Sequence, residues 1–114
     1  MKVLVCGGRD FLDAKTVFDT LDSWHRARPI TLVVHGDAKG ADSLAKLWAI
    51  SRDIPVKAYP ANWELHGKAA GPVRNKQMLK EENPDVVLAF PGGRGTNNMV
   101  NLANFANVPV RFCE

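Results

Sequence analysis

The sequence predicts an α/β fold, an open three-layer sandwich with a five-stranded parallel sheet between two layers of helices. Two observations predict it. Five short apolar runs recur along the chain, and segments with helical spacing of apolar residues separate them. Several of the runs are apolar nearly throughout, as is typical of strands that are covered on both faces. Because right-handed crossovers connect such strands, the expected strand order is 3-2-1-4-5.

The predicted strands and the helices between them alternate without a break. The strands are KVLVC (2–6), ITLVVH (30–35), PVKAY (55–59), DVVLAF (85–90) and VPVRF (108–112). Three helices have clear apolar faces, formed by Val17, Leu21 and Trp24, by Leu44, Leu47 and Trp48, and by Met99, Leu102, Ala103 and Ala106. The remaining helix, over roughly 72–82, has a weaker pattern, with Pro72 in its first turn and Pro84 ending it. Asp13 and Thr96 are the expected N-caps.

One long segment, PANWELHGKAAG (60–71), has no pattern of a strand or helix. It exceeds the usual connection, so we expect a lid or a pocket wall there. The chain shows no internal repeat, low-complexity segment or linker, and its 114 residues fit one domain, 1–114.

Composition narrows the class of protein. With 46% hydrophobic and 24% charged residues the chain has the balance of a globular protein, and its apolar runs are too short to cross a membrane. The N-terminus lacks a signal-peptide pattern, which predicts a cytoplasmic protein with no membrane partner. Cys6 and Cys113 belong to strands that another strand should separate, so no disulfide is expected.

The charge is mildly basic, with a net charge of +3 and a pI near 9.1. This favours an anionic partner. The lysines and arginines are scattered, however, without the dense cluster of a nucleic-acid-binding arm, so nucleic acid is not the expected partner.

Glycine-rich turns follow three of the predicted strands: GGRDF (7–11), GDAKGAD (36–42) and PGGRGT (91–96). In parallel sheets ligands bind beyond the carboxyl ends of the strands, where the strand order reverses. Glycine lets backbone amides approach an anion closely, although a glycine after a strand can also serve the turn alone. Three such turns at one edge predict an anion-binding pocket.

Several familiar sites are excluded. The turns match neither a Walker A loop nor the GxGxxG fingerprint, and no GxSxG elbow or Cys–His signature occurs. His25, His35 and His66 lack metal-ligand spacing, so we expect neither a metal nor a cofactor.

Charged residues near this edge can serve either a ligand or the fold itself. Arg74 near a helix start is either the counter-charge of an anionic ligand or an exposed arginine, and Arg9, Lys39 and Arg94 add positive charge. Asp42 either lines the pocket or stabilises the start of its helix.

Trp63, in the segment 60–71, either stacks on a base or closes the edge of the core.

The motifs GGRDF, HGDAKGAD, GKAAGPVRNKQM and PDVVLAFPGGRGT resemble, in order and spacing, those of the YspA/cpYpsA-related branch of the SLOG superfamily. The resemblance covers nearly the whole chain. It implies a Rossmann-like fold that binds nucleotides or nucleotide-derived molecules at this edge. The superfamily includes the LOG phosphoribohydrolases and the DNA-processing protein DprA.

The chain departs from the LOG pattern PGGxGTxxE. Residues 91–96 match the loop and Arg74 falls near the LOG arginine, but Met99 stands in the place of the catalytic glutamate and Asn75 in that of a lysine. The resemblance therefore implies the phosphate-binding loop without the known chemistry, and Met99 is expected to pack in the core.

The leading hypothesis is binding of a phosphate-bearing nucleotide or nucleotide-derived small molecule. The predicted contact residues are Gly7, Gly8, Arg9, Gly36, Asp37, Gly40, Asp42, Arg74, Asn75, Gly92, Gly93, Gly95 and Thr96. One alternative is a hydrolase acting on such a ligand, with Arg74, Asp10 and Asp42 as candidate catalytic residues. Another is single-stranded nucleic-acid binding, by analogy with DprA. The LOG resemblance also implies that the chain can form a homo-oligomer.

Overall fold

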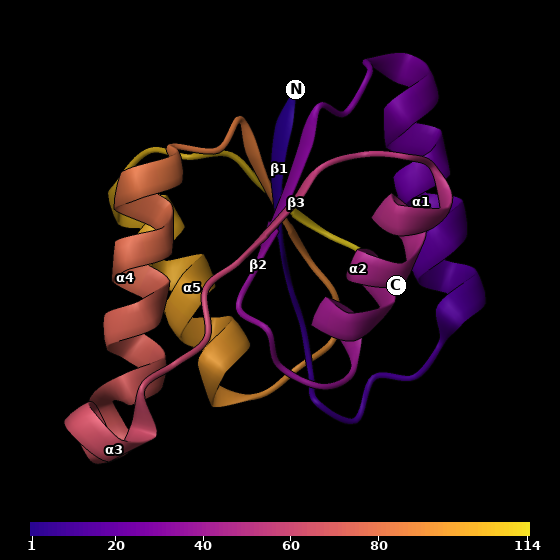
Figure 1. The fold of residues 1–114 in the computed structure, drawn as a ribbon. Helices are drawn as coiled ribbons and strands as arrows, with labels where there is room; N and C mark the ends of the chain where they lie inside the picture. Colours follow the sequence, from indigo (N-terminus) through magenta and orange to yellow (C-terminus); the bar gives the residue numbers. More distant parts are fainter.

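Five parallel strands form the central sheet, in the order β3-β2-β1-β4-β5 (Figure 1). The structure is a computed structural model that describes residues 1–114. The elements are β1 (Lys2–Cys6), α1 (Ala14–Ala27), β2 (Leu32–His35), α2 (Ala41–Ser51), β3 (Val56–Ala58), α3 (Trp63–His66), the 3₁₀ turn η1 (Gly67–Ala69), α4 (Ala70–Glu82), β4 (Val86–Ala89), α5 (Arg94–Phe105) and β5 (Val110–Phe112). The predicted fold class and strand order are confirmed.

Helices cover both faces of the sheet, with α1 and α2 on one side and α4 and α5 on the other (Figure 1). Alternation along the strands explains the two layers, because successive side chains point to opposite faces. Val3 and Val5 of β1 pack in the cluster under α1 and α2, whereas Leu4 packs in the cluster under α4 and α5.

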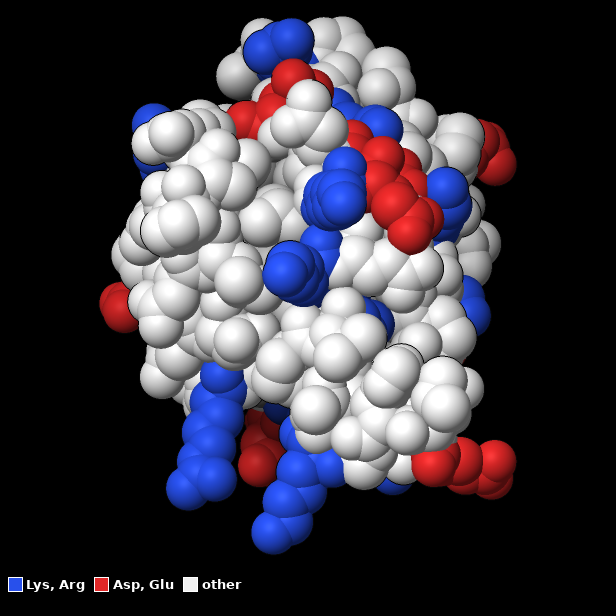
Figure 2. Space-filling model, turned by 90° about the vertical axis from the view of Figure 1, so that its left-hand side faces the viewer, with Lys and Arg blue, Asp and Glu red and all other residues white.

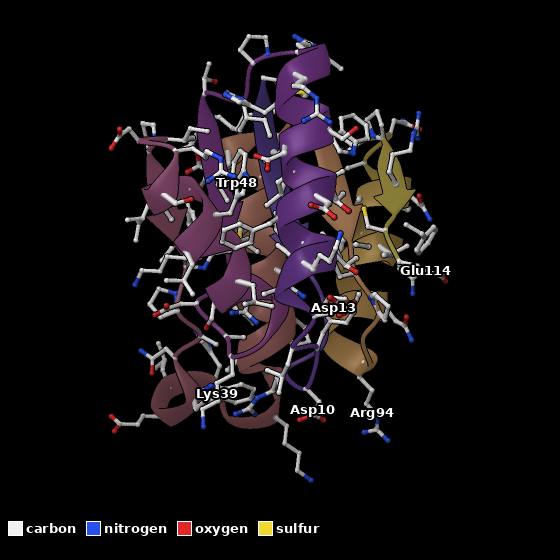
Figure 3. The ribbon with its side chains drawn as sticks, turned by 90° about the vertical axis from the view of Figure 1, so that its right-hand side faces the viewer. Asp10, Asp13, Lys39, Trp48, Arg94 and Glu114 are labelled. Carbon is white, nitrogen blue, oxygen red and sulfur yellow. The ribbon has the colours of Figure 1, made fainter.

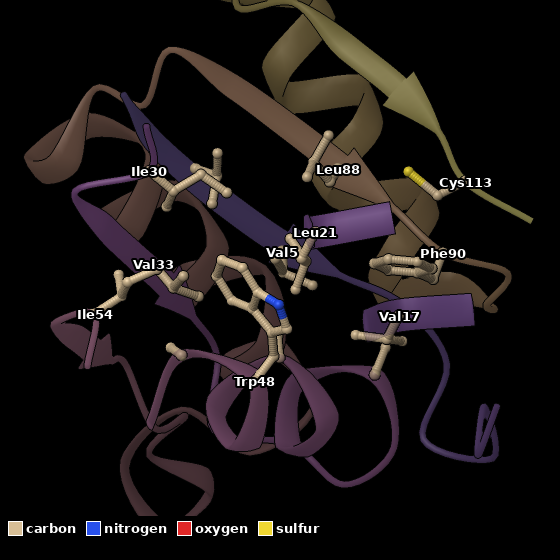
Figure 4. Close-up of a cluster of buried hydrophobic side chains, with 14 of the residues drawn as sticks. Val5, Val17, Leu21, Ile30, Val33, Trp48, Ile54, Leu88, Phe90 and Cys113 are labelled. Atoms are coloured by element: carbon tan, nitrogen blue, oxygen red, sulfur yellow. The ribbon is translucent and has the colours of Figure 1, made fainter. Parts of the chain in front are cut away.

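Trp48 of α2 is fully buried in the first cluster, beside Val33, Leu21 and Val5 (Figure 4). Its indole N–H donates to Asp22 of α1 at 2.8 Å. This hydrogen bond satisfies the polar atom of a buried tryptophan and joins the two helices on this face.

The sequence pattern predicted no helix or strand over 60–71. In the structure, this segment contains α3, η1 and the start of α4. The Asn62 side chain caps α3 by accepting a hydrogen bond from the amide of Leu65 at 3.0 Å. A helix of four residues is too short to show periodicity, which explains why the pattern missed it. Helix α4 begins at Ala70, slightly earlier than expected.

One predicted N-cap is confirmed and the other is wrong. Asp13 caps α1 by accepting a hydrogen bond from the amide of Thr16 at 3.1 Å. Helix α5 instead begins at Arg94 with Gly93 as its N-cap, so Thr96 lies inside the first turn.

Two apolar positions that the helical spacing placed on buried faces are exposed. Leu47 of α2 faces the solvent, since Trp48 beside it takes the buried position. Ala106 lies beyond the last turn of α5 as its C-cap.

Both cysteines, Cys6 and Cys113, are free, in agreement with the sequence prediction. None of the helices combines the length and the apolar character that crossing a membrane requires.

Candidate functional site

The carboxyl ends of β1, β2 and β4 open into one cleft of about 1040 Å³. The three glycine-rich loops, α3 and the first turns of α4 and α5 line it. Asp10, Lys39 and Arg94, from three different loops, project from this edge of the molecule (Figure 3). The structure therefore brings the three loops together, and every predicted contact residue except Gly40 lines the cleft.

Gly40 lies beneath the first loop rather than on the cleft wall. Its φ is 77°, and a Cβ at this position would lie 2.6 Å from the carbonyl oxygen of Arg9 and still closer to that of Gly8. The glycine is thus required for a turn and a close backbone approach, not for contact with a ligand.

The loop after β2 uses its own amides internally. Asp42 accepts hydrogen bonds from the amides of Gly36, at 3.0 Å, and Ala38, at 3.3 Å. His35 Nδ1 accepts one from the amide of Asp37, at 2.9 Å. Three consecutive amides of this loop are therefore engaged within the protein and unavailable to an anion, contrary to the role expected of a glycine-rich turn.

Burial raises the pKa of Asp42 to about 6, even though the two amides favour its ionised form. The side chain is 5% exposed. Its carboxylate holds the loop after β2 in place, which is a structural role for one of the candidate catalytic residues.

The first and third loops pack directly on each other. The amide of Gly8 donates to the carbonyl oxygen of Pro91 at 2.8 Å. A Cβ on Gly92 would collide with the Thr96 side chain and would lie 2.7 Å from the nitrogen of Gly8. Gly92 is thus needed for packing between the loops.

The start of α5 faces the cleft with its donors free. The amides of Arg94, Gly95 and Thr96 donate to no protein group, and no side chain caps the helix. A Cβ on Gly93 or Gly95 would meet no atom within 4 Å, so the space beside the amides is open. Free amides at the positive end of a helix dipole form a site for an anion.

Arg74 of α4 lies across the floor of the cleft and is half-buried. Its Nη1 donates to the carbonyl oxygen of Gly36 and, at 3.3 Å, to that of Tyr59, beyond the ends of β2 and β3. Burial lowers the pKa of the guanidinium. Arg74 is therefore neither a free surface arginine nor a group reserved for a ligand, because it already holds two strand ends together.

Asn75 continues this connection to the third loop. Its Oδ1 accepts a hydrogen bond from Arg74 Nε at 2.9 Å, and its Nδ2 donates to the carbonyl oxygen of Gly95 at 3.1 Å and to Asn98 Oδ1 at 3.0 Å. Together Arg74 and Asn75 form a polar brace that runs from the ends of β2 and β3 to the first turn of α5.

The cleft is positively charged. Five cationic side chains line it, against three carboxylates. The cations are Arg9, Lys39, Lys68, Arg74 and Arg94, and the carboxylates are Asp10, Asp37 and Asp42. Figure 2, which looks onto the face of α4 and α5, shows long Lys and Arg side chains extending from the lower edge of the molecule.

The cleft offers few groups for covalent chemistry. Cys6 lines it, but burial raises the pKa of this thiol to about 12, so it remains protonated. Met99 is fully buried beside Leu4 and Val34, away from the cleft, in agreement with its predicted packing role. Asp10 is exposed at the mouth. No three His, Cys, Asp or Glu side chains are grouped so that they could hold a metal ion.

Three lining residues extend the predicted site. Trp63 is 60% exposed and lines the cleft, so the alternative in which it closes the edge of the core is wrong. Lys68 and Asn98 were not predicted. Asn98 falls three residues after Gly95 on α5, a spacing that places both on one helical face and was a usable signal.

Comparison with known proteins agrees with this architecture. The model of the YspA, cpYpsA-related SLOG family (YAcAr) matches residues 1–66. The Gene 61 protein of Mycobacterium phage D29 is 41% identical over 117 residues, covering 96% of this chain and 93% of that protein. The X-ray structure of DNA processing protein A (DprA) from Streptococcus pneumoniae aligns with a TM-score of 0.54 at 18% identity. That match covers 96% of this chain and 58% of the DprA chain, and it shows a shared fold.

Proposed function

The chain belongs to the YspA, cpYpsA-related SLOG family, and from this membership and the geometry of the cleft we propose that it binds a phosphate-bearing nucleotide or nucleotide-derived small molecule. The observation that carries the proposal is the start of α5. Three amides there lack protein partners and face a cleft that five cationic side chains line. A phosphate group satisfies the amides and the surrounding charge at once.

The cleft supports binding better than turnover. Met99, in the position of the LOG glutamate, is buried in the core. The Asp42 carboxylate is already hydrogen-bonded to amides of the loop after β2. Asp10 and Asp37 are the remaining carboxylates of the cleft, and both are exposed. A hydrolase mechanism would require one of these exposed carboxylates to act as the acid or base.

Nucleic-acid binding is the second candidate, because the fold is shared with a DNA processing protein. The distribution of charge favours a small ligand. A strand of nucleic acid requires cations along a continuous track, whereas five cations here surround one cleft.

Calorimetric titration tests the proposal with nucleoside monophosphates, their parent nucleosides and a short single-stranded oligonucleotide. We expect monophosphates to bind more tightly than nucleosides, and Arg94→Ala to weaken binding of monophosphates. Arg111→Ala is the matched control, since Arg111 is also exposed but lies on β5 outside the cleft lining.

Failure of every phosphorylated ligand to bind would contradict the proposal. Tighter, steeply salt-dependent binding of the oligonucleotide would favour the nucleic-acid alternative instead. Mass spectrometry of small molecules released from the purified protein by denaturation would identify a natural ligand.

A further inference from the structure

We propose that Trp63 is the stacking platform for the base of the bound molecule, in a ligand whose phosphate lies at the start of α5. The inference rests on the proposed function, because it requires the phosphate to lie at the start of α5.

Trp63 is the one tryptophan whose ring is largely open to solvent. It is 60% exposed, whereas Trp48 is fully buried and Trp24 packs partly buried against the same core cluster. The exposed ring borders the cleft and not a remote surface. Indole stacks on the face of any nucleobase, and such stacking is a common means of holding a base without reading its identity.

Helix α3 places Trp63 beside the first turn of α4. Asn62 caps the start of the helix, and the amide of Gly67 donates to the carbonyl oxygen of Trp63 at its end. The indole tip, Cη2, lies 3.9 Å from the place that a Cβ on Gly71 would occupy. The ring therefore rests beside the first turn of α4.

Helix α4 contacts both the ring and the start of α5. Gly71, beside the indole, and Asn75, which donates to the carbonyl oxygen of Gly95 at 3.1 Å, are four residues apart on α4. Four residues advance an α-helix by ~6 Å, or about one turn. A single pentose connects a base to its phosphate over a comparable span, which favours a mononucleotide unit as the ligand.

Affinity measurements with matched ligands test the platform. Nucleoside 5′-monophosphates carry the base, and ribose 5-phosphate presents the same sugar phosphate without it. Trp63→Ala is expected to weaken monophosphate binding by about 5- to 150-fold and to leave ribose 5-phosphate binding unchanged. Trp63→Phe, which keeps an aromatic face, is expected to retain most of the monophosphate affinity. Phe105→Ala is the matched control, since Phe105 is an exposed aromatic residue at the far end of α5, outside the cleft.

Tryptophan fluorescence gives a second measurement. Monophosphates are expected to quench the native emission, corrected for absorption by the base, and to lose this effect in Trp63→Phe. The inference is overturned if Trp63→Ala leaves monophosphate affinity unchanged or weakens both ligands equally. In those cases the proposed function still stands, because the phosphate ligands bind. If neither class of ligand binds the native protein, both the inference and the proposed function are wrong.

Discussion

The carboxylate of Asp42 reaches back from the first turn of α2 to the amide of Gly36, which donates to it at 3.0 Å. The carboxylate also accepts a hydrogen bond from the amide of Ala38. Removing the carboxylate therefore leaves two backbone donors without a partner in a largely buried environment. Asp42→Ala is expected to lower the free energy of unfolding by about 1–3 kcal/mol, measured by urea denaturation. The exposed Asp10 is the control, and a similar loss in Asp10→Ala would show that the cost is not specific to the buried contacts.

The same carboxylate predicts a pH dependence. Its pKa is about 6 in the fold and near 3.8 when unperturbed, so between these values the native state binds more protons than the unfolded state. Asp42 therefore contributes less stability as the pH rises from about 4 to 6. Relative to Asp42→Asn, the native protein should lose stability over this range, in urea titrations at several pH values.

His35 acts in the opposite direction on the native protein, since burial lowers its pKa and its contribution falls as the pH decreases below about 6.5. His35 is present in both the native protein and Asp42→Asn, so its contribution to the pH dependence of stability cancels in the comparison. A flat difference between the two proteins would contradict the raised pKa of Asp42.

Arg74→Ala should affect both stability and binding. The change removes the hydrogen bonds to the carbonyl oxygens of Gly36 and Tyr59 and one cation of the cleft. Under the proposed function the guanidinium also contacts the phosphate, so we expect loss of this charge-assisted contact to weaken monophosphates by roughly ten- to a hundredfold and parent nucleosides much less. Equal weakening of nucleotides and nucleosides would leave Arg74 with its structural role alone.

Gly92 and Gly93 are adjacent, but their substitutions should differ in effect. Gly92→Ala forces a Cβ against Thr96 and Gly8, and is expected to cost about 1–3 kcal/mol of unfolding free energy. A side chain on Gly93 meets nothing within 4 Å, so Gly93→Val should cost less than about 1 kcal/mol, from its weaker N-cap preference.

The valine side chain at position 93 would occupy the open space beside the free amides, and binding of monophosphates should be abolished. Thermal unfolding and calorimetry of both variants separate the two effects. Unchanged nucleotide affinity in Gly93→Val would exclude the phosphate from this loop.

The native protein is expected to release no measurable free base from nucleoside monophosphates. Met99 is fully buried and can neither share a proton nor stabilise a cationic sugar. Met99→Glu should mainly destabilise the fold, because it places an ionisable group in an apolar cluster without a partner. Chromatography detects the base. Robust release by the native protein, lost in Arg74→Ala, would establish an enzyme, with Asp10 the first residue to mutate.

The strand order and the converging loops could be predicted because they depend on local patterns. Runs such as KVLVC and DVVLAF are apolar on both faces, and right-handed connections then leave few orders for the sheet. The position of each glycine-rich loop follows directly from the strand before it, so the sequence is sufficient to place the three loops at one edge of the sheet.

Which of the glycine-rich turns keeps its backbone amides free could not be predicted. Gly36 and Gly93 both follow strands in glycine-rich turns, yet the amides of 36–38 are satisfied from within and those of 94–96 are not. The difference arises because the Asp42 and His35 side chains accept hydrogen bonds from the amides of residues 36–38. The direction of these side chains depends on tertiary packing, which the spacing of residues in the sequence does not reveal.

The internally bonded loop after β2 has a consequence for the ligand binding that we propose in the cleft. Because buried side chains already order residues 36–38, association loses little conformational entropy in this wall, and more of the contact energy appears as affinity. A wall that is formed in advance cannot reshape itself around a poorly matching molecule. Under the proposed function, we therefore expect ligands of the wrong shape to be excluded by steric misfit, without movement of this loop.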